Sequence, residues 1–200
     1  MKFLFKNKKK DARMIYIDEH IDDFDLETAL RQISAQRREQ ALRFKFERGQ
    51  RTCVLAYLLL KRALREEYGI KENPIFEYGE HGKPAIVGHP EIFFNLSHCR
   101  EAVACAVSDR PIGIDVESVR EFHESLVRYT MNDQEVAAIM GAARPEVAFI
   151  RLWTMKEARL KLTGEGISNN MKDVLCGNAF RYDTVECLQQ RYIYTVCEYC

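Results

Sequence analysis

Residues 102–117 read AVACAVSDRPIGIDVE, and this stretch decides the fold class more than any other part of the chain. Residues 102–107 alternate alanine with valine and cysteine, which is typical of a tightly packed strand. Residues 109–111, Asp-Arg-Pro, predict a turn that leads into a second strand over 112–117. We therefore expect these two strands to form a hairpin in the middle of the chain.

Helical patterns flank the two strands on both sides. Before them, residues 26–33 place apolar side chains at the spacing i, i+3, i+4, i+7, and residues 48–68 predict a longer, central helix that ends at Gly69. After them, helices are predicted over 124–129, from a cap at Asn132 or Asp133 through Met140, and from Pro145 to about Thr163, where Gly164 ends the last one.

Further short strands complete the pattern of the chain. They are predicted at residues 14–17, 76–78, 92–96, around 180–182 and at 192–196. Each half thus runs through helices and then strands, without the β-α-β alternation of a parallel sheet. This order predicts an α+β fold and argues against a doubly wound sheet.

The length of 200 residues suits one domain or two small halves packed together. Residues 1–12 are expected to be a basic N-terminal extension, residues 13–110 the N-terminal half, and residues 111–200 the C-terminal half with the candidate metal and phosphate motifs. No linker rich in proline, glycine or serine separates the halves.

The composition restricts the class of protein. Hydrophobic residues make up 46% of the chain, enough for a sizeable core, and 30 Lys and Arg balance 30 Asp and Glu. A zero net charge lacks the global basic field of a general nucleic-acid binder. The apolar runs are too short for a membrane span or a signal peptide, and the seven scattered cysteines should be reduced. We therefore expect a cytoplasmic protein without nucleic-acid or membrane partners.

Two carboxylates stand two positions apart on the predicted strand 112–117. Asp115 and Glu117 leave the same face, while Ile114 and Val116 point into a core. Carboxylates on one face repel each other unless a cation lies between them, and hard oxygen ligands suit Mg²⁺. Taken alone, the pair could equally be the wet face of an edge strand.

A second cluster, WTMKEARLK over residues 153–161, lies in a predicted helix. Glu157 and Lys161 are four apart and share one face, and Lys156 flanks the glutamate. A third carboxylate beside two lysines is what a site for a metal ion and a pyrophosphate needs. The alternative is an ordinary Glu–Lys pair on a helix surface.

Two weaker motifs lie between the helices of the first half and the two carboxylates. Residues 95–98, NLSH, close a strand, and a histidine there could donate to a phosphate or serve as an ordinary loop residue. Residues 82–84, GKP, form a loop whose backbone could approach a ligand closely, or simply a turn.

In this order, the motifs resemble those of the Sfp-type 4'-phosphopantetheinyl transferases. The family pattern has an arginine in an N-terminal helix, then G-K-P, N-[LI]-S-H, G-[IV]-D-[IV]-E and W-x-x-K-E-[AS]-x-x-K. Here these correspond to Arg51 and to residues 82–84, 95–98, 113–117 and 153–161. The resemblance covers roughly residues 14–200, and it implies two similar α+β halves related by a pseudo-twofold, with coenzyme A bound between them.

The resemblance also implies roles for single residues. It would place Asp115, Glu117 and Glu157 around Mg²⁺, and it gives Glu157 and Lys161 catalytic roles. Coenzyme A would be held by a set of loop and helix residues: Arg51 and His98 at the 3'-phosphate, Lys83 and Pro84 near the adenine, and Ser97, Lys156 and Lys161. Glu135 is the nearest match to a family glutamate that is a candidate base. Arg37 fits one of two family lysines, but Gln40 stands where the other is expected.

The function expected from this resemblance is transfer of the 4'-phosphopantetheine group of coenzyme A to a serine of an apo acyl or peptidyl carrier protein, which releases 3',5'-ADP. The enzyme would be of the holo-[acyl-carrier-protein] synthase type (EC 2.7.8.7), active as a monomer that meets its carrier transiently. The alternatives are a non-catalytic protein that binds coenzyme A or a carrier, and another Mg²⁺-dependent enzyme acting on nucleotides or nucleic acid.

Overall fold

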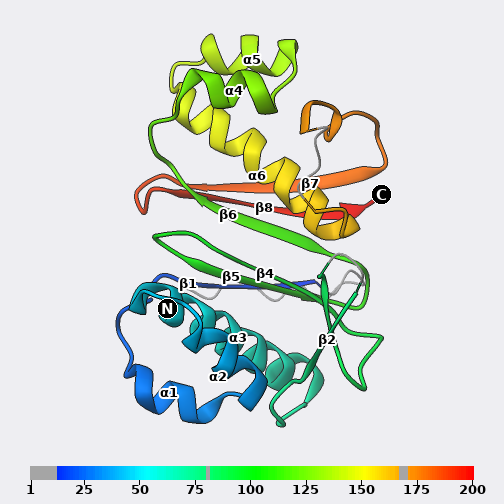
Figure 1. Cartoon of the computed structure of the whole chain (residues 1–200). Helices are drawn as coiled ribbons and strands as arrows, with labels where there is room; N and C mark the ends of the chain where they lie inside the picture. The colour runs from blue at the N-terminus through cyan, green and yellow to red at the C-terminus, as the bar shows by residue number, and fades with distance from the viewer. Residues whose placement is uncertain (1–12, 80–81, 167–170) are drawn as a thin grey trace.

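The computed structural model describes residues 13–79, 82–166 and 171–200, and its main elements form four layers (Figure 1). Two three-stranded antiparallel sheets face each other in the middle of the molecule. Helices of the first half cover the outer face of one sheet, and helices of the second half cover the outer face of the other. The predicted extension 1–12 lies outside the described residues.

The first half builds its sheet from strands that are far apart in the sequence. The strand order is β1 (Met14–Asp18), β5 (Val103–Ser108), β4 (Phe93–His98). The helices are α1 (Leu26–Gln32), α2 (Ala35–Leu42) and α3 (Glu47–Tyr68), and a separate ribbon pairs β2 (Phe76–Tyr78) with β3 (Pro84–Ile86). Helix α2, which begins at the cap Ser34, is the helix that the sequence analysis did not predict.

The second half repeats this plan. Its strand order is β6 (Gly113–Ser118), β8 (Tyr192–Tyr199), β7 (Phe180–Cys187). Its helices are α4 (Glu124–Thr130), α5 (Asp133–Met140) and α6 (Pro145–Thr163), followed by a 3-10 turn over Met171–Asp173. In each half the first strand pairs with the last, and the last pairs with the one before it. The predicted α+β fold of two similar halves is thereby confirmed.

The predicted hairpin between residues 102–107 and 112–117 is wrong. Strand β5 has β1 on one edge and β4 on the other, so neither edge is open to β6. Strand β6 instead pairs with β8, more than seventy residues later in the chain. The turn at residues 109–111 therefore carries the chain from one sheet to the other.

The alternation in β5 explains how the two sheets come together. Val103, Cys105 and Val107 pack against α3 in the core of the first half. Ala104 and Ala106 point the other way, into a cluster that contains Ile114, Val116 and Tyr194 of the second sheet. Small alanine side chains let the sheets approach closely, so residues 102–107 are buried on both faces.

Side chains of β4 satisfy the open edge of β6. The backbone nitrogen of Ile114 donates to Asn95 Oδ1 at 3.1 Å, and that of Val116 donates to Ser97 Oγ at 3.2 Å. Buried backbone N–H groups need such partners, and among the described strands β8 alone pairs with β6, on its other edge. The seam between the halves is therefore held by two polar side chains of the NLSH motif.

The predicted ends of the long helices are confirmed. Gly69 ends α3 and Gly164 ends α6, each with a positive φ that glycine adopts easily. Asn132 caps α5 in a capping box with Glu135. Among the helices in the described part of the chain, none combines the length and the apolar character needed to cross a membrane.

Candidate active site

Gly113 lets α6 lie directly against β6. A Cβ atom at this position would lie 2.0 Å from the carbonyl oxygen of Ala158 and 2.7 Å from the backbone nitrogen of Leu162. These are backbone atoms, so only a shift of the whole helix could make room for a side chain. The close approach brings Glu157 and Lys161 of the helix beside the carboxylates of the strand.

Asp115 is the centre of the resulting polar cluster. Its buried Oδ1 accepts hydrogen bonds from Ser97 Oγ at 2.9 Å and from Lys161 Nζ at 2.6 Å. Lys161 Nζ also donates to Ser97 Oγ at 2.8 Å, which closes a triangle between β4, β6 and α6. Charge-assisted hydrogen bonds of this kind fix geometry as well as adding energy. One oxygen of Asp115 is therefore locked in place by the protein.

Two other carboxylate oxygens of the cluster are buried without a hydrogen-bond partner among the described residues. They are Asp115 Oδ2 and Glu157 Oε1. Burial raises the pKa of Glu157, the charge of Asp115 raises it further, and Lys161 opposes both. Since buried polar atoms in native proteins nearly always find a partner, this pair of oxygens is suited to a cation.

Glu117 follows Asp115 on the same face of β6. Burial is the main cause that raises the pKa of Glu117 to about 7, the charge of Asp115 is the next, and that of Glu157 adds a smaller part. Lys161 and Arg120 act in the opposite direction. Burial and the neighbouring carboxylates thus outweigh the two cationic side chains in setting the pKa of Glu117.

The carboxylate oxygens of the cluster are of the kind that magnesium prefers, but only two of the three carboxylates come together. Mg²⁺ prefers oxygen ligands and usually takes one or two carboxylates together with waters and substrate phosphates. The unpartnered oxygens of Asp115 and Glu157 meet that need. Within residues 13–79, 82–166 and 171–200, however, no three His, Cys, Asp or Glu side chains form a group that could hold a metal ion. The expected set of three carboxylates is thus not assembled, and Glu117 stands beside the pair.

His98 lies next to this cluster at the end of β4. Although its side chain is accessible to solvent, partial desolvation is the main cause that lowers its pKa. The positive charges of Lys161 and Arg37 lower it further, and Asp115 opposes them. Arg37 is held in turn by two hydrogen bonds to the carbonyl oxygen of Cys53, at 3.1 and 2.9 Å. One cationic side chain from each half therefore faces the histidine, which suits an anionic ligand.

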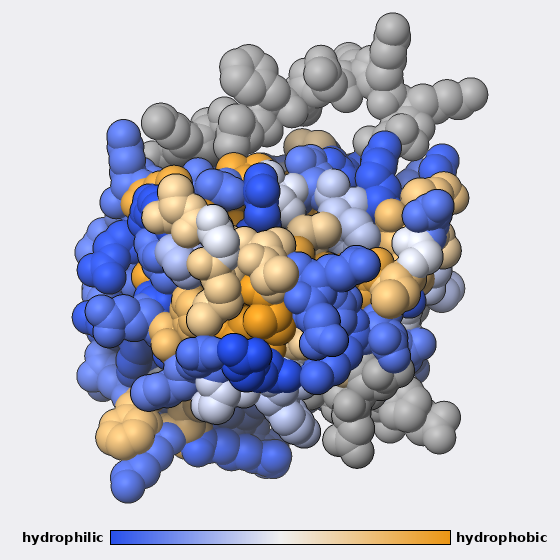
Figure 2. Space-filling model, turned by 90° about the horizontal axis from the view of Figure 1, so that it is seen from above, coloured by the Kyte–Doolittle hydropathy of each residue, from blue (hydrophilic) through white to orange (hydrophobic). Residues whose placement is uncertain are grey.

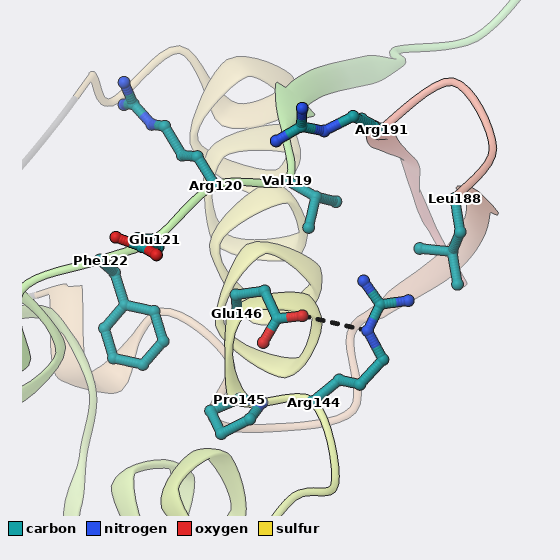
Figure 3. A pocket seen from close by; sticks show the side chains of 9 residues that line it. All are labelled: Val119, Arg120, Glu121, Phe122, Arg144, Pro145, Glu146, Leu188 and Arg191. Carbon is teal, nitrogen blue, oxygen red and sulfur yellow. Dashed lines mark hydrogen bonds and ion pairs between the residues drawn. The ribbon is translucent and has the colours of Figure 1, made fainter.

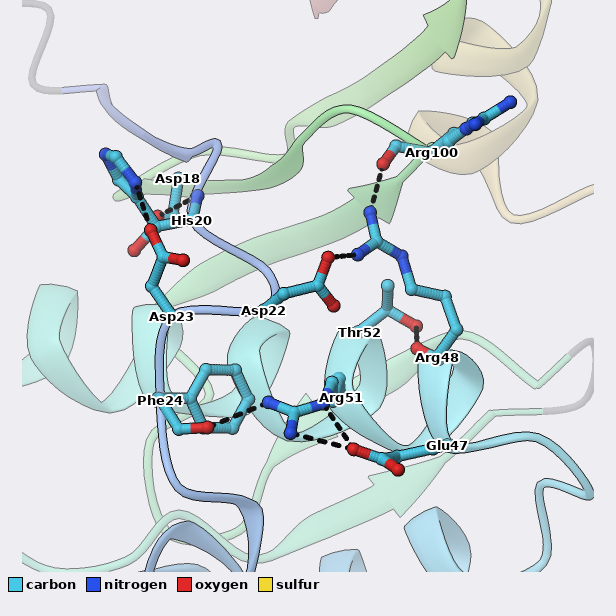
Figure 4. A network of polar contacts seen from close by, with 10 residues as sticks. All are labelled: Asp18, His20, Asp22, Asp23, Phe24, Glu47, Arg48, Arg51, Thr52 and Arg100. Atoms are coloured by element: carbon cyan, nitrogen blue, oxygen red, sulfur yellow. Dashed lines mark hydrogen bonds and ion pairs between the residues drawn. The ribbon is translucent and has the colours of Figure 1, made fainter.

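Arg51, which was expected at the same phosphate, lies in a different network (Figure 4). It forms an ion pair with Glu47 at 2.7 Å and donates to the carbonyl oxygen of Phe24 at 2.8 Å. Its side chain is only 17% exposed. Arg51 and His98 share no hydrogen bond among the described residues, and the role of Arg51 at the phosphate stays a prediction.

Arg48, one turn before Arg51, acts on the same end of the first half (Figure 4). It pairs with Asp22 and donates to the carbonyl oxygen of Arg100, in the turn that follows His98. Arg48 therefore links the turn that follows His98 to the loop at Asp22.

Lys83 reaches from the first half to the second. Its Nζ donates to the carbonyl oxygen of Leu162 at 2.5 Å, close to where Gly164 ends α6. Burial lowers the pKa of Lys83. Pro84 is the first residue of β3, opposite Tyr78. The lysine thus caps the helix that carries Lys161, and the expected contact of this loop with adenine stays a prediction.

Lys156 does not join the cluster, contrary to expectation. Its side chain is fully buried, and Nζ donates to Glu135 at 2.7 Å and to the carbonyl oxygens of Met171 at 2.7 Å and Thr130 at 3.1 Å. An ammonium group has three protons to donate, so these partners use all of them. In the structure Lys156 is thus directed to α5 and the 3-10 turn, and its expected contact with a phosphate stays a prediction.

Glu135, the candidate base, is oriented by two hydrogen bonds. Its Oε2 accepts from the backbone nitrogen of Asn132 at 2.9 Å and from Lys156 Nζ at 2.7 Å. Both bonds use the same oxygen, which leaves Oε1 for a substrate proton. The side chain is 11% exposed, and its ion pair with Lys156 ties α5 to α6, the helix that also carries Glu157.

The sequence motifs include Arg37 and Asn95 but do not predict how these two residues act. The charge of Arg37 acts on His98, and Asn95 completes the edge of β6. The signal for Asn95 was a polar residue between Phe94 and Leu96 in an otherwise apolar strand. No local signal tied Arg37 to the histidine, because the two are about sixty residues apart.

Comparison with protein families gives a consistent result over both halves. Residues 111–192 match the family described as the 4'-phosphopantetheinyl transferase superfamily. Residues 22–110 match the family described as 4'-phosphopantetheinyl transferase, N-terminal. Between them, the two matches include every residue of the cluster.

Curated relatives agree with the family matches. The chain is 37% identical over 139 residues to 4'-phosphopantetheinyl transferase psf-1 of Bacillus pumilus, which covers 68% of this chain and 60% of that protein. It is 29% identical over 157 residues to 4'-phosphopantetheinyl transferase Sfp of Bacillus subtilis, with 77% and 70% covered. It is 39% identical over 113 residues to 4'-phosphopantetheinyl transferase AcpT of Salmonella typhi, with 54% and 55% covered.

Proposed function

The chain belongs to the 4'-phosphopantetheinyl transferase superfamily, and on that premise we propose that it transfers the phosphopantetheine group of coenzyme A to a serine of an apo carrier protein. The observation that carries this proposal is the pair of buried, unpartnered oxygens of Asp115 and Glu157 beside the ammonium group of Lys161. Such a pair is suited to a cation and an anionic substrate together, not to a structural ion pair alone.

The charges of the cleft would orient the donor. His98, Arg37 and Lys161 would bind its phosphates, and a phosphate at His98 would raise the pKa that these cations now lower. Asp115 and Glu157 would hold Mg²⁺, with Glu117 beside them, and the ion would supply Lewis-acid stabilisation of the pyrophosphate. Ser97 keeps Lys161 and Asp115 in a fixed geometry.

The transfer itself exchanges one P–O bond for another. The serine oxygen of the carrier bonds to the β-phosphorus, and the bond from that phosphorus to the leaving 3',5'-ADP breaks. Lys161 would neutralise part of the charge that develops, and Glu135 Oε1 would accept the serine proton, directly or through a water. Lys156 acts as a positioning residue for Glu135. As in other phosphoryl transfers, positioning and electrostatics dominate.

The proposal extends to details of the activity. It assigns the enzyme to the holo-[acyl-carrier-protein] synthase type, with a transient carrier complex, a monomeric enzyme and a cytoplasmic location. Support for a monomer comes from the cluster itself, because β4, β6 and α6 of one chain supply all its members.

Intact mass of an apo acyl carrier protein tests the proposal directly. After incubation with this protein, coenzyme A and Mg²⁺, the carrier should gain the mass of one phosphopantetheine group, and EDTA should prevent the gain. Binding of coenzyme A without any mass gain across several apo carriers would contradict the proposal and favour a non-catalytic binder. Nucleotide release without a carrier would favour another Mg²⁺-dependent enzyme.

A further inference from the structure

Two hydrogen bonds among the described residues join the first half to the last turn of α6. Lys161 Nζ donates to Ser97 Oγ of β4 at 2.8 Å, and Lys83 Nζ donates to the carbonyl oxygen of Leu162 at 2.5 Å. The two bonds reach α6 at consecutive residues, one through a side chain and the other through the backbone. The first half therefore holds, at two points, the turn of α6 that presents Lys161 to Asp115.

The start of α6 lies among residues of its own half. The helix begins there without a side-chain cap, beside a cavity of about 500 Å³ that is lined by residues 119–122, 144–146, 188 and 191 (Figure 3). Helices α4 and α5 cover the same end of α6 (Figure 1). Figure 2 shows their outer surface, where apolar side chains gather in the middle and hydrophilic ones surround them. The start of α6 thus belongs to the second half, whereas its last turn is shared between the halves.

The carbonyl oxygen of Leu162 needs a partner from outside its helix. The last four C=O groups of an α-helix have no N–H group within the helix from which to accept a hydrogen bond. Leu162 is the last residue but one of α6, and the ammonium group of Lys83 supplies the missing donor. The negative end of the helix dipole also favours a cation at this position. The bond is therefore stabilised both by hydrogen bonding and by charge.

The ribbon of β2 and β3 gives Lys83 a firm base. The backbone nitrogen of Gly79 donates to the carbonyl oxygen of Lys83 at 3.0 Å, which closes the turn before β3. Phe76 and Ile86 stand opposite each other in the ribbon and are buried in the core of the first half. Gln36 of α2 forms two hydrogen bonds with the backbone of Phe76, at 3.0 and 3.1 Å. The ammonium group thus extends from a segment that is anchored in the first half.

The stem of Lys83 lies against the glycine that ends α6. A Cβ atom at Gly164 would be 3.5 Å from Lys83 Cδ and 3.8 Å from Lys83 Cβ. The lysine is half-buried in this position. Packing of the stem reduces the number of rotamers that the side chain can adopt, so the ammonium group is kept near the end of the helix.

We propose that Lys83 is a positioning residue for the transfer reaction, because it clamps the last turn of α6 to the first half and so holds Lys161 in place beside Asp115. This inference rests on the proposed function, and it gives the ammonium group of Lys83 a role that is separate from contact with coenzyme A. A displacement of about 1 Å in a catalytic constellation can cost up to about 100-fold in rate. Since Leu162 directly follows Lys161, releasing its carbonyl oxygen frees the turn that carries the catalytic lysine.

The proposed division of labour predicts which kinetic constant should change. The charge already present on the donor is shared among His98, Arg37 and Lys161, so a looser Lys161 weakens binding only slightly. The charge that develops during transfer falls to Lys161 in particular. A loss of interaction in the transition state alone lowers kcat and leaves KM unchanged.

Lys61 provides a matched control. Its Nζ donates to the carbonyl oxygen of Gln32, the last residue of α1, at 3.1 Å. This is the same kind of bond, from a lysine to the C-terminal end of a helix, but both partners lie in helices of the first half. Lys83→Met and Lys61→Met each remove an ammonium group and keep an apolar stem, and each should lower the midpoint of thermal unfolding slightly.

The experiment measures transfer from coenzyme A to an apo acyl carrier protein in the presence of Mg²⁺. For Lys83→Met, kcat should fall about tenfold, while the KM for coenzyme A stays within about twofold of wild type. The KM for the carrier should also stay unchanged, since the surface over α4 and α5 lies at the other end of α6. Lys83→Arg keeps a donor for Leu162 and should recover most of the rate, and Lys61→Met should match wild type.

Three outcomes would overturn the inference while the proposed function stands. An unchanged kcat in Lys83→Met would show that the clamp does not affect the reaction. A higher KM for coenzyme A with an unchanged kcat would assign the ammonium group to binding of the donor. Equal losses of kcat in Lys83→Met and Lys61→Met would indicate a general effect of lower stability.

If wild type transfers nothing to any carrier, the proposed function fails, and hydrogen–deuterium exchange decides the clamp alone. Peptides that cover residues 155–166 should then exchange faster in Lys83→Met than in wild type, and Lys61→Met should leave them unchanged. Equal exchange of these peptides in Lys83→Met and wild type would refute the clamp.

Discussion

The two halves of this protein share one topology but place different residues at its centre. In the first half, β1 turns Met14 and Tyr16 toward α3. At the matching strand of the second half, β6 turns Gly113 and Asp115 toward α6. Where Tyr16 stands opposite Cys105 in its sheet, Asp115 stands opposite Thr195.

This difference shows how one arrangement of helices and strands can surround either an apolar core or a cluster of charged side chains. The first core is filled by large apolar side chains from α3, including Val54, Leu60 and Leu64. The second lets its helix approach closely at a glycine and fills the nearby space with a carboxylate, a lysine and threonines. Chemistry at the seam thus depends on a few substitutions at matching positions, and not on a different arrangement of elements.

The largest effect should come from the residue that distinguishes the strands most. Asp115→Asn keeps the shape of the side chain but removes the charge that meets Lys161 and a cation. We expect the kcat/KM for holo carrier formation to fall by more than about 100-fold, the upper end of losses seen when only a supporting group is removed. Tyr16→Phe, at the matching face of β1, should stay close to wild type. Full activity of Asp115→Asn at saturating Mg²⁺ would contradict the metal assignment.

Gly113→Ala tests whether close approach of the helix is what makes the second half reactive. The added Cβ meets the carbonyl oxygen of Ala158 at 2.0 Å, so α6 must move. We expect a loss of about 1–3 kcal/mol in the free energy of unfolding and about 100-fold in activity, because small displacements of catalytic groups are costly. Met14→Ala at the matching strand should lower stability without this loss of activity. Denaturant unfolding measures the stability of each variant, and kcat/KM measures its activity. Equal activities of Gly113→Ala and Met14→Ala would contradict the role given to the close approach.

Ser97→Ala tests the seam that only the second half uses. The variant leaves the buried backbone nitrogen of Val116 without its acceptor and releases Asp115 Oδ1. We expect an affinity for Mg²⁺ lower by about 10–100-fold, measured from the Mg²⁺ dependence of the rate. Ser108→Ala is the control, since Ser108 is also buried and also accepts from a backbone nitrogen, that of Arg110, but lies away from the cluster. Similar Mg²⁺ dependence in the two variants would argue against a positioning role for Ser97.

The smallest effect is expected from the titration of Glu117, which makes the free energy of unfolding depend on pH. The pKa of Glu117 is raised to about 7, so between pH of about 4.3 and 7 the folded protein keeps a proton that the unfolded chain has released. The unfolded state then binds fewer protons, and the free energy of unfolding falls as pH rises through this window.

Thermal unfolding without Mg²⁺ should therefore show wild type losing stability relative to Glu117→Gln as pH rises through that window. Added Mg²⁺ should recover part of the loss above pH of about 7, since a cation stabilises the charged cluster. Parallel pH profiles for the two proteins, with and without Mg²⁺, would show that Glu117 lies in an ordinary environment.

Much of the fold follows from local patterns in the chain. The apolar stretch within residues 48–68 and Pro145 before residues 146–163 predict the long helices, and Gly69 and Gly164 predict where they end. The alternation of side chains predicts which segments are strands, but not how they pair. These features depend on residues within a few positions of each other, so the sequence alone determines them.

Local patterns do not determine which elements pair with each other, because pairing depends on the tertiary structure. The turn at 109–111 looked like the middle of a hairpin, but both edges of β5 were already taken by β1 and β4. Lys156 and Glu157 are neighbours in the motif, yet one is bound by α5 and the other faces β6.

The sequence by itself determined most of the elements and their order, with α2 as the exception, and it showed carboxylates, lysines and a histidine in motifs typical of a metal and phosphate site. Only the tertiary structure decided that Asp115, Ser97 and Lys161 meet, that the charge of Arg37 acts on His98, and that Lys156 supports Glu135. The physical reason is that propensity and periodicity act over one or two turns of chain, whereas these contacts depend on which sheet edges remain open and which side of a helix a neighbour covers.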